Sequence, residues 1–443
     1  MARSPDANEA TQDQHSATQK SKQRSGASDE RPIIGVDDRV SIARAIPLGI
    51  QHMMSMFGST VLVPMLTGLH PSIAIMCSGI GTMCYLLVTA NKIPSYLGSS
   101  FAFISPIIAI GATQGLDAAL SGVVVAGLVF LLFAALIKAI GTTWMDHILP
   151  PVLVASVIVV IGIGLSATAV RMAFYSGTDS FKALGAAIAL VTLLSAVVFS
   201  SMPGLIGTIP VLLAIIVGYI CAVAADLVDF KPVMDAAWIG LPKFHFPRFD
   251  WGAIALIAPI AIVVVIEHIG HLLVVGEVVD KDYRDMLPHS LAGDGIATVI
   301  AGFLGGPPTT TYAENIGVMS VTRVYSTQVF WYAASFALIV GGFCPKLEAL
   351  IESIPVPVMG GVSLLLFGLI ASNGLRTLVS NRVDFSLNRN LMIASVVLIV
   401  GTGMETAGIS IPLGAYELPG MAVSALLGIA LNVLLPRPKS QVE

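Results

Sequence analysis

Charged side chains are scarce in this chain. Only 11% of its 443 residues are Asp, Glu, Lys or Arg, whereas a soluble domain carries about 25%. Hydrophobic residues make up 55% of the chain, and its mean hydropathy is +0.86. A soluble fold of this composition would lack polar surface to present to water. The composition therefore predicts a polytopic membrane protein, in which each span takes about 20 mostly apolar residues.

Cysteines and basic tracts are also few. The four cysteines lie in or beside apolar runs and form no CxxC pair, which excludes a disulfide framework and a thiolate metal site. They are Cys77, Cys84, Cys221 and Cys344. The net charge is −4 and no basic tract is interleaved with aromatics, so nothing indicates a nucleic-acid partner. No metal and no other cofactor is expected.

The two ends of the chain differ from the rest. Residues 1–40 are polar and mixed in charge, so we expect a disordered cytoplasmic tail. This stretch lacks the apolar segment of a signal peptide. Residues 437–443 are predicted to form a second short cytoplasmic tail, which leaves residues 41–436 as the membrane unit.

Apolar stretches alternate with short polar segments from Arg44 onward. They predict an all-α membrane fold with about 14 spans, each bounded to within several residues. The expected spans are 42–66, 71–90, 94–113, 118–139, 148–170, 181–200, 205–226, 251–276, 290–306, 307–322, 325–344, 354–373, 389–404 and 415–435.

Two of these segments, the third and the tenth, are irregular. The first opens with Ile93-Pro94-Ser95-Tyr96-Leu97-Gly98-Ser99-Ser100-Phe101, and the second with Pro307-Pro308-Thr309-Thr310-Thr311-Tyr312. Proline, glycine and runs of Ser or Thr oppose a full-length helix. Each segment is therefore predicted to form a short extended strand followed by a half-helix.

Basic residues indicate the orientation of the spans. With the N-terminus inside, most of the 23 Lys and Arg residues fall in cytoplasmic segments. The exceptions are Arg171, Lys182, Lys231, Lys243, Arg248 and Lys346. An even number of spans places both termini in the cytoplasm, so we expect a multi-pass protein of the cytoplasmic (inner) membrane.

The chain contains a weak internal repeat. Three short matches share one offset of about 216 residues, or seven spans, and the two irregular segments fall in register with them. The matches pair Ile50-Gln51-His52 with Ile266-Glu267-His268, Gly79-Ile80-Gly81-Thr82 with Gly295-Ile296-Ala297-Thr298, and Ser95-Tyr96 with Thr311-Tyr312. An odd number of spans per repeat inverts the second half, a plan found in many secondary transporters. Chance similarity among apolar segments is the alternative.

A few ionisable residues interrupt the apolar segments. Glu267, His268 and His271 lie in one span, and Glu314 and Asn315 follow the second irregular opening. Ionisable groups at membrane depth are costly and mark functional sites. Glu267 and His271 share a helix face at i, i+4, whereas His268 points elsewhere and is interpreted as a packing residue. The alternative role for the pair is to hold helices together.

The irregular segments offer a substrate site. Their half-helices begin near Phe101 and Glu314, and free N–H groups and positive dipole ends would meet there. These donors suit carbonyl oxygens, while the carboxylates of Glu267 and Glu314 accept from N–H groups. A planar cyclic imide, with alternating C=O and N–H groups, complements both sets.

Several motifs resemble the nucleobase–ascorbate transporter family. The stretch Glu314-Asn315-Ile316-Gly317-Val318-Met319-Ser320-Val321-Thr322-Arg323 is similar to the family signature, and Gln51-His52 and Pro94–Phe103 also match. The run Glu267-His268-Ile269-Gly270-His271 resembles the bacterial uracil permease branch. The resemblance extends from about Arg44 to Pro436.

This resemblance implies two inverted repeats of seven segments. A core domain would comprise 42–139 and 251–344, and a gate domain 148–226 and 354–435. It also implies alternating access and a homodimer formed through the gate domain. The implied activity is proton-coupled uptake of uracil or a related pyrimidine base, with no enzymatic reaction.

The resemblance also implies residue roles. Glu267 and Glu314 would accept from the N–H groups of the base, and the backbone N–H groups of Phe101, Ala313 and Glu314 would donate to its carbonyls. Glu267, His271 and Asn315 would serve proton coupling. The uracil branch often has glycine where this chain has Ala313, whose methyl narrows the pocket, leaves the exact base open and admits a broader pyrimidine permease. A permease for xanthine or another nucleobase is the alternative within the family.

Two other classes of protein were weighed. An intramembrane metalloprotease needs His-Glu-x-x-His, but here the histidines are three apart and the glutamate comes first. An anion exchanger of similar architecture would use the facing helix N-termini. The two glutamates at the same place oppose it.

Overall fold

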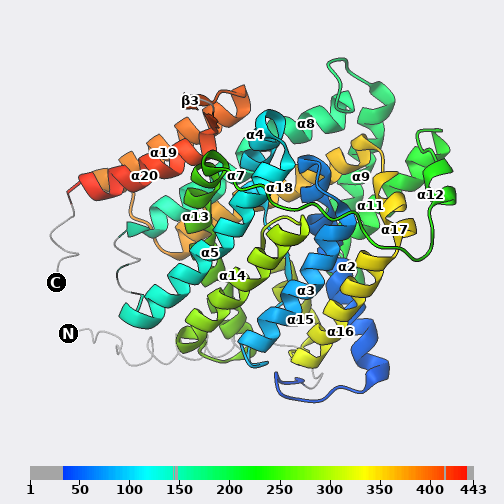
Figure 1. The fold of residues 1–443 in the computed structure, drawn as a ribbon, viewed down its shortest axis with the longest axis horizontal. Helices are drawn as coiled ribbons and strands as arrows, with labels where there is room; N and C mark the ends of the chain where they lie inside the picture. The colour runs from blue at the N-terminus through cyan, green and yellow to red at the C-terminus, as the bar shows by residue number, and fades with distance from the viewer. Residues whose placement is uncertain (1–32, 143, 145–147, 414–415, 437–443) are drawn as a thin grey trace, which may run out of the picture.

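The computed structural model describes residues 33–142, 144, 148–413 and 416–436. It is a mostly helical molecule in which the helices lie side by side (Figure 1). The predicted tails at 1–32 and 437–443 lie outside the described residues.

The first half of the chain forms helices where apolar runs predict spans. In order, the elements are α2 (Ile42–Thr67), α3 (Pro71–Val88), β1 (Leu97–Ser99), the 3₁₀ turn η1 (Phe101–Phe103), α4 (Ile104–Gln114), α5 (Leu116–Ile140), α7 (Pro151–Gly164), α8 (Ser166–Tyr175), α9 (Ala183–Ser200), α10 (Leu205–Thr208), α11 (Pro210–Ala224) and α12 (Lys231–Asp235).

The second half follows a similar order. It comprises α13 (Trp251–Val279), the 3₁₀ turn η2 (Arg284–Met286), α14 (Leu287–Leu304), β2 (Thr309–Thr311), α15 (Ala313–Thr322), α16 (Thr327–Phe336), the π-helical turn η3 (Ala337–Gly341), α17 (Pro345–Glu352), α18 (Val356–Ser380), α19 (Asn388–Ala407), β3 (Ile411–Leu413), β4 (Tyr416–Leu418) and α20 (Gly420–Leu434).

Helix length and composition identify a multi-pass membrane protein. Among the described residues, nine helices are long and apolar enough to cross a membrane, and ten if the bent pair Thr327–Gly341 and Pro345–Glu352 counts as one. The 14 membrane segments predicted from the sequence include shorter helices, and their number stays a prediction.

The helices pack in two groups. In one, α14 lies against α3 and α5, α13 against α5, and α16 against α2. In the other, α18 lies against α7, α8 and α9, while α19 packs on α7 and α20. Helices from the two halves of the sequence are thus interleaved in both groups (Figure 1).

Local sequence explains where key elements begin and how closely they pack. The Asp250 side chain accepts hydrogen bonds from the N–H groups of Gly252 and Ala253 at 3.0 and 2.9 Å, which caps α13.

At the crossing of helices α5 and α14, a Cβ on Gly127 would lie 2.7 Å from the Gly295 carbonyl oxygen. Small residues at such crossings let the backbones of membrane helices approach closely.

The two irregular segments pair with each other. Strands β1 and β2 are antiparallel, with Leu97 opposite Thr311 and Ser99 opposite Thr309. Each strand is followed by a helical segment, η1 and α4 after β1 and α15 after β2. A side chain at Gly98 would meet the Tyr312 ring at 2.7 Å, so glycine is what permits this close approach.

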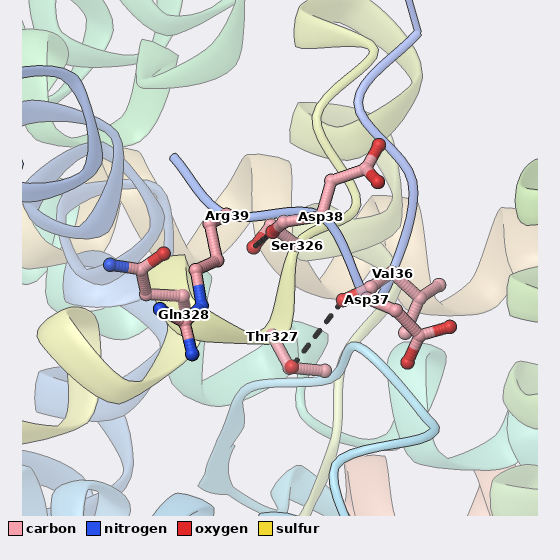
Figure 2. A pocket seen from close by; sticks show the side chains of 7 residues that line it. All are labelled: Val36, Asp37, Asp38, Arg39, Ser326, Thr327 and Gln328. Carbon is pink, nitrogen blue, oxygen red and sulfur yellow. Dashed lines mark hydrogen bonds between the residues drawn. The ribbon is translucent and has the colours of Figure 1, made fainter. Parts of the chain in front are cut away.

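Residues 33–40 differ from the expected tail. Ile34 pairs with Val324 through hydrogen bonds to Arg323 and Tyr325, while Val36 and Val40 are buried. The segment lies across the start of α16 and lines a pocket with residues 326–328 (Figure 2). Residues 33–40 therefore belong to the packed unit, in which Ile34 pairs with Val324 and the side chains of Val36 and Val40 are buried.

Candidate functional site

Two helix starts adjoin near the paired strands. The residues preceding η1 and α15, Ser100 and Tyr312, make no side-chain capping hydrogen bond. The first-turn N–H groups at Phe101 and Ala313 are therefore donors without an intrahelical acceptor, whereas that of Glu314 donates to its own carboxylate. The rings of Phe101 and Tyr312 meet edge to face at 6.2 Å, and the Tyr312 hydroxyl donates to the Ser99 carbonyl.

Phe101 also reaches the second group of helices. Its ring lies 6.1 Å from the Phe367 ring at an interplanar angle of 85°. Phe367 belongs to α18, so the aromatic side chains close this side of the helix starts with apolar surface. Such an apolar wall beside a few polar groups is typical of small-molecule sites.

Glu314 lies in the first turn of α15. It is partly buried, and the Ser59 hydroxyl of α2 donates to its carboxylate at 3.4 Å. The carboxylate is close enough to Glu267 and His271 for their charges to interact. Its position at a helix N-terminus is one that favours an anion.

Glu267 approaches the same place from α13, which packs against η1, β2 and α15. Its side chain is partly buried, and its charge acts on Tyr312 together with that of Glu314. Within the described part of the chain, its carboxylate makes no hydrogen bond. The acceptor oxygens of Glu267 are therefore free for a ligand.

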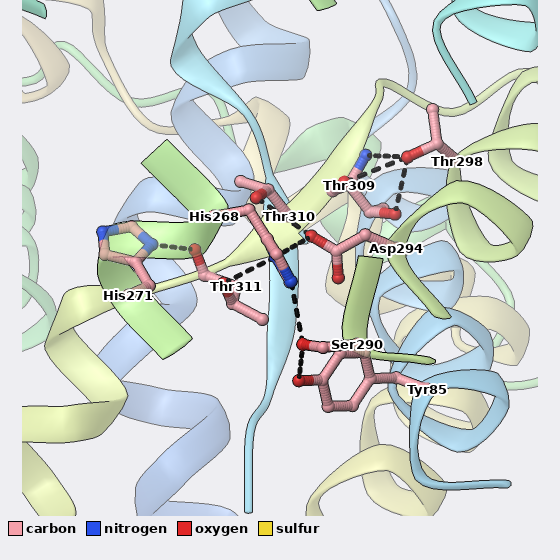
Figure 3. A network of polar contacts seen from close by, with 9 residues as sticks. All are labelled: Tyr85, His268, His271, Ser290, Asp294, Thr298, Thr309, Thr310 and Thr311. Carbon is pink, nitrogen blue, oxygen red and sulfur yellow. Dashed lines mark hydrogen bonds and ion pairs between the residues drawn. The ribbon is translucent and has the colours of Figure 1, made fainter. Parts of the chain in front are cut away.

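His271 faces β2. Its Nδ1 atom lies 2.9 Å from the Thr311 carbonyl oxygen (Figure 3). Since a carbonyl only accepts, Nδ1 donates this bond and Nε2 of the neutral ring is left as an acceptor. The sequence predicts that His271 shares a helix face with Glu267. In the structure, the hydrogen bond of His271 goes to Thr311 of β2.

Asn315 is buried against α2. Its Oδ1 lies 2.7 Å from Nδ1 of His52, whose ring contacts Phe330 at 4.5 Å. The buried Nδ2 atom of Asn315 has no hydrogen-bond partner among the described residues. Asn315 thus fixes the His52 ring and keeps two unused donor hydrogens.

A second polar network lies behind β2, and sequence reasoning missed it. His268 contacts Asp294 and Ser290 at 2.7 and 2.8 Å, and Ser290 is 2.6 Å from the Tyr85 hydroxyl. Thr310 donates to Asp294 at 3.2 Å, which ties the network to the strand (Figure 3). His268 is therefore a buried residue that joins α13 to α14 and β2 through polar contacts.

A signal for this network was present in the sequence. Asp294 falls inside the apolar stretch predicted as the span 290–306, so the cost of a membrane carboxylate applies to it as it does to Glu267. One oxygen of Asp294, Oδ1, is buried and has no hydrogen-bond partner in the described part of the chain.

Comparison with known proteins assigns the family. A family model described as the permease family matches residues 43–408, and this family comprises the nucleobase–ascorbate transporters. The chain belongs to this family. The permease resembles proteins named for transport and not for enzymatic reactions.

Its relatives are similar along most of their length. It is 48% identical over 420 residues to the uracil permease of Bacillus caldolyticus, covering 93% of this chain and 96% of that protein. It is 43% identical over 412 residues to the uracil permease of Escherichia coli K12, covering 91% and 94%. It is also 40% identical over 423 residues to the putative pyrimidine permease RutG of the same strain, covering 94% and 95%.

Solved structures share the fold at low identity. The transmembrane domain of the cyanobacterial bicarbonate transporter BicA matches with a TM-score of 0.62 at 15% identity, covering 90% of the permease and all of that chain. The murine anion transporter Slc26a9 matches with a TM-score of 0.64 at 10% identity, covering 89% and 69%.

Proposed function

We propose that this permease imports uracil, or a closely related pyrimidine base, together with a proton. One observation carries the proposal. The uncapped helix starts at Phe101 and Ala313 adjoin the carboxylates of Glu267 and Glu314. Backbone N–H donors and carboxylate acceptors therefore lie close together, beside the aromatic rings of Phe101 and Tyr312.

The edge of a pyrimidine base is complementary to this set. The N–H groups of Phe101, Ala313 and Glu314 donate to its carbonyl oxygens, and Glu267 and Glu314 accept from its ring N–H groups. The Phe101 ring covers a face of the base. Loss of one buried hydrogen-bond partner costs about 1–3 kcal/mol, so a base that lacks one of these groups is rejected.

The names of the relatives support a pyrimidine as the base. Two are uracil permeases and one is a putative pyrimidine permease. The methyl group of Ala313 lies at the start of α15 and reduces the space beside the donors. Xanthine or another nucleobase is the alternative cargo, and its larger ring system must fit the same space.

The proposed transport cycle is alternating access. The first and second groups of helices serve as core (42–139 and 251–344) and gate (148–226 and 354–435), built from 14 segments in two inverted repeats. Side chains bridge these groups, since Gln51 donates to Thr208 at 2.8 Å and Ser105 to Glu405 at 3.0 Å. Exchange of such contacts accompanies the movement of one group against the other.

Proton coupling is assigned to three residues near the base. Glu267 binds the base, His271 follows one turn later on α13, and Asn315 adjoins Glu314 on α15. A neutral base gains no driving force from the membrane potential alone, so concentrative uptake needs an ion. The proton is the only coupling ion in this proposal, and no cofactor takes part.

The proposal extends to assembly and location. The permease is placed in the cytoplasmic (inner) membrane with both termini in the cytoplasm, as a homodimer formed through the gate helices. The basic residues of the loops favour this orientation. The partners are thus the base, the lipid and a second copy of the chain.

An anion exchanger is the second candidate. The shared fold of two anion transporters and the facing helix starts favour it. The carboxylates of Glu267 and Glu314 oppose it, because a bound anion would lie beside two negative groups.

Uptake of radiolabelled uracil into proteoliposomes separates the candidates. We expect competition by unlabelled uracil and by close pyrimidine analogues, and none by bicarbonate or chloride. Stronger competition by xanthine than by uracil would contradict the pyrimidine assignment. Uptake of bicarbonate or chloride in place of bases would contradict base transport altogether.

A further inference from the structure

A cluster of metal-ligating side chains lies outside the base site. The ligand atoms of His70, Glu348 and Glu352 all lie within 4.8 Å of one another. His70 directly precedes α3, whereas the two glutamates lie on α17. The 26-residue helix α2, about 39 Å long, separates His70 from the N-terminal segment 33–40.

The geometry of this cluster points to a transition-metal site, and we propose that it binds Zn²⁺ or a similar divalent ion. Zn²⁺ binds histidine nitrogen at about 2.0–2.1 Å and carboxylate oxygen at about 2.0–2.2 Å, so tetrahedral ligand atoms lie about 3.4 Å apart. Nδ1 of His70 and Oε1 of Glu348 are already 3.2 Å apart. Glu352 is exposed, and its side chain is free to complete the set.

The two glutamates favour a cation between them. Glu348 and Glu352 are four residues apart on α17, so they share a helix face, and like charges at this spacing destabilise a helix. The charge on Glu352 interacts with those of Glu348, His70 and Lys243. A divalent ion replaces this repulsion with two attractive contacts.

Neighbouring residues hold the histidine in place. The ring of His245 stacks on His70 at 5.2 Å with an angle of 22° between the planes. Nδ1 of His245 in turn lies 3.5 Å from Asp117 at the start of α5. Side chains that orient a ligating histidine are a regular part of metal sites.

The donor set selects the ion. One imidazole nitrogen and two carboxylates suit Zn²⁺, Ni²⁺ or Co²⁺, whereas Ca²⁺ and Mg²⁺ prefer oxygen ligands alone. The site offers three protein ligands and leaves a fourth position to water.

The position of α17 gives the metal a consequence for transport, and this step rests on the proposed function. Helix α17 connects η3, which packs against α3, to the start of α18 in the second group. Just after α17, the Ser353 hydroxyl lies 2.7 Å from the Tyr219 hydroxyl of α11. A metal that ties His70 to α17 therefore fixes the connection between the two helix groups and slows their relative movement.

Calorimetric titration of the purified full-length chain with ZnCl₂ tests the site itself. We expect one strong binding event, which falls at least about tenfold in affinity in His70→Ala and in Glu352→Gln. The matched controls are His289→Ala and Glu277→Gln, two exposed residues elsewhere in the chain. Unchanged Zn²⁺ affinity in folded Glu352→Gln, or equal binding of Ca²⁺, would overturn the proposal.

Uptake measurements test the consequence. Zn²⁺ added outside right-side-out vesicles should slow uracil uptake in the parent chain, with recovery on adding EDTA and little effect in Glu352→Gln. Binding without slower uptake overturns the proposed restraint on transport. If the chain moves no base at all, the proposed function fails, while the binding titration still decides the metal site.

Discussion

Nδ1 of His268 lies 2.7 Å from Oδ2 of Asp294, and both side chains are 1% exposed. The pair joins α13 to α14 behind the strand that precedes α15. Removal of one partner of a buried hydrogen-bonded pair costs about 1–3 kcal/mol, and more where the remaining group is charged. This contact therefore holds the strand β2, through Thr310, at a fixed position relative to the carboxylate of Glu267 on the same helix as His268.

His268→Ala should consequently destabilise the permease and impair base binding. The change removes a partner from Asp294, whose Oδ1 already has none among the described residues, so we expect a loss of about 3 kcal/mol in stability. Thermal unfolding of the detergent-solubilised protein measures it. The control is Asp282→Asn, at a loop position 70% exposed, which should leave the transition unchanged. Equal unfolding temperatures for His268→Ala and the parent would contradict a structural role for the pair.

Substitutions at the two glutamates test the base site directly. Glu267→Gln should lose concentrative uptake while staying folded, because an amide presents donor hydrogens where acceptors are needed. Glu314→Ala should abolish base binding more completely than any single loop-charge substitution. Equilibrium binding of radiolabelled uracil to the purified variants compares them, with Glu277→Gln as the exposed control. Normal accumulation of uracil by Glu267→Gln would contradict the assignment of Glu267 to the base site.

Gly98→Ala should disturb the strand pair. The added Cβ would meet the Tyr312 ring at 2.7 Å and the Met56 side chain at 2.9 Å. Overpacking of this kind costs about 1–3 kcal/mol, and a shift of Tyr312 also moves the helix start at Ala313. We expect weaker uracil binding and a lower unfolding temperature. Gly403→Ala is the control, since nothing lies within 4 Å of its added methyl.

Much of this arrangement could be predicted from sequence, for identifiable reasons. Apolar runs predict the helices because a span in the lipid core is built mostly of apolar residues. Pro94 and Pro307-Pro308 mark the strands because proline cannot continue a helix. The partner of His271 could not be predicted. Spacing along α13 places it on the face of Glu267, but the Thr311 carbonyl, which no local pattern encodes, takes its hydrogen.

The docking of residues 33–40 could not be predicted for the same reason. Composition averages over a window, whereas docking depends on single side chains such as Val36 and on backbone pairing at Ile34. Both depend on the end of α15 lying nearby, which is a tertiary relationship.

Truncation of the N-terminus should therefore depend on where it ends. Deletion of residues 1–32 should leave uptake intact. Deletion of residues 1–38, expected from composition alone to be harmless, removes the Ile34 hydrogen bonds to Arg323 and Tyr325 at 3.0 and 2.9 Å. We expect that longer deletion to lower the unfolding temperature. Equal stability of the two truncated chains would show that the docked segment contributes nothing.

Accessibility labelling tests the proposed topology. Single cysteines in the N-terminal tail and in the loop between Arg376 and Arg389 should react from the same, cytoplasmic side. A cysteine at Lys346, in the first turn of α17, should react from the other side. Tail and loop labels on opposite sides would contradict the even number of spans.

Proton coupling gives the last prediction, and it connects the site to the transport cycle. His271 donates Nδ1 to the strand and keeps Nε2 as an acceptor, and its charge interacts with Glu314. Proton uptake on this ring or on either carboxylate changes the charge beside the base. Uptake of uracil should therefore rise as the external pH falls, collapse with a protonophore and need no sodium.

His271→Ala should weaken the pH dependence and concentrative uptake more than equilibrium binding, because the ring contacts β2 rather than the free acceptors of Glu267. Exposed His289→Ala should change neither. Uptake by reconstituted protein that follows a sodium gradient and ignores a proton gradient would refute the mechanism even if uracil is the cargo.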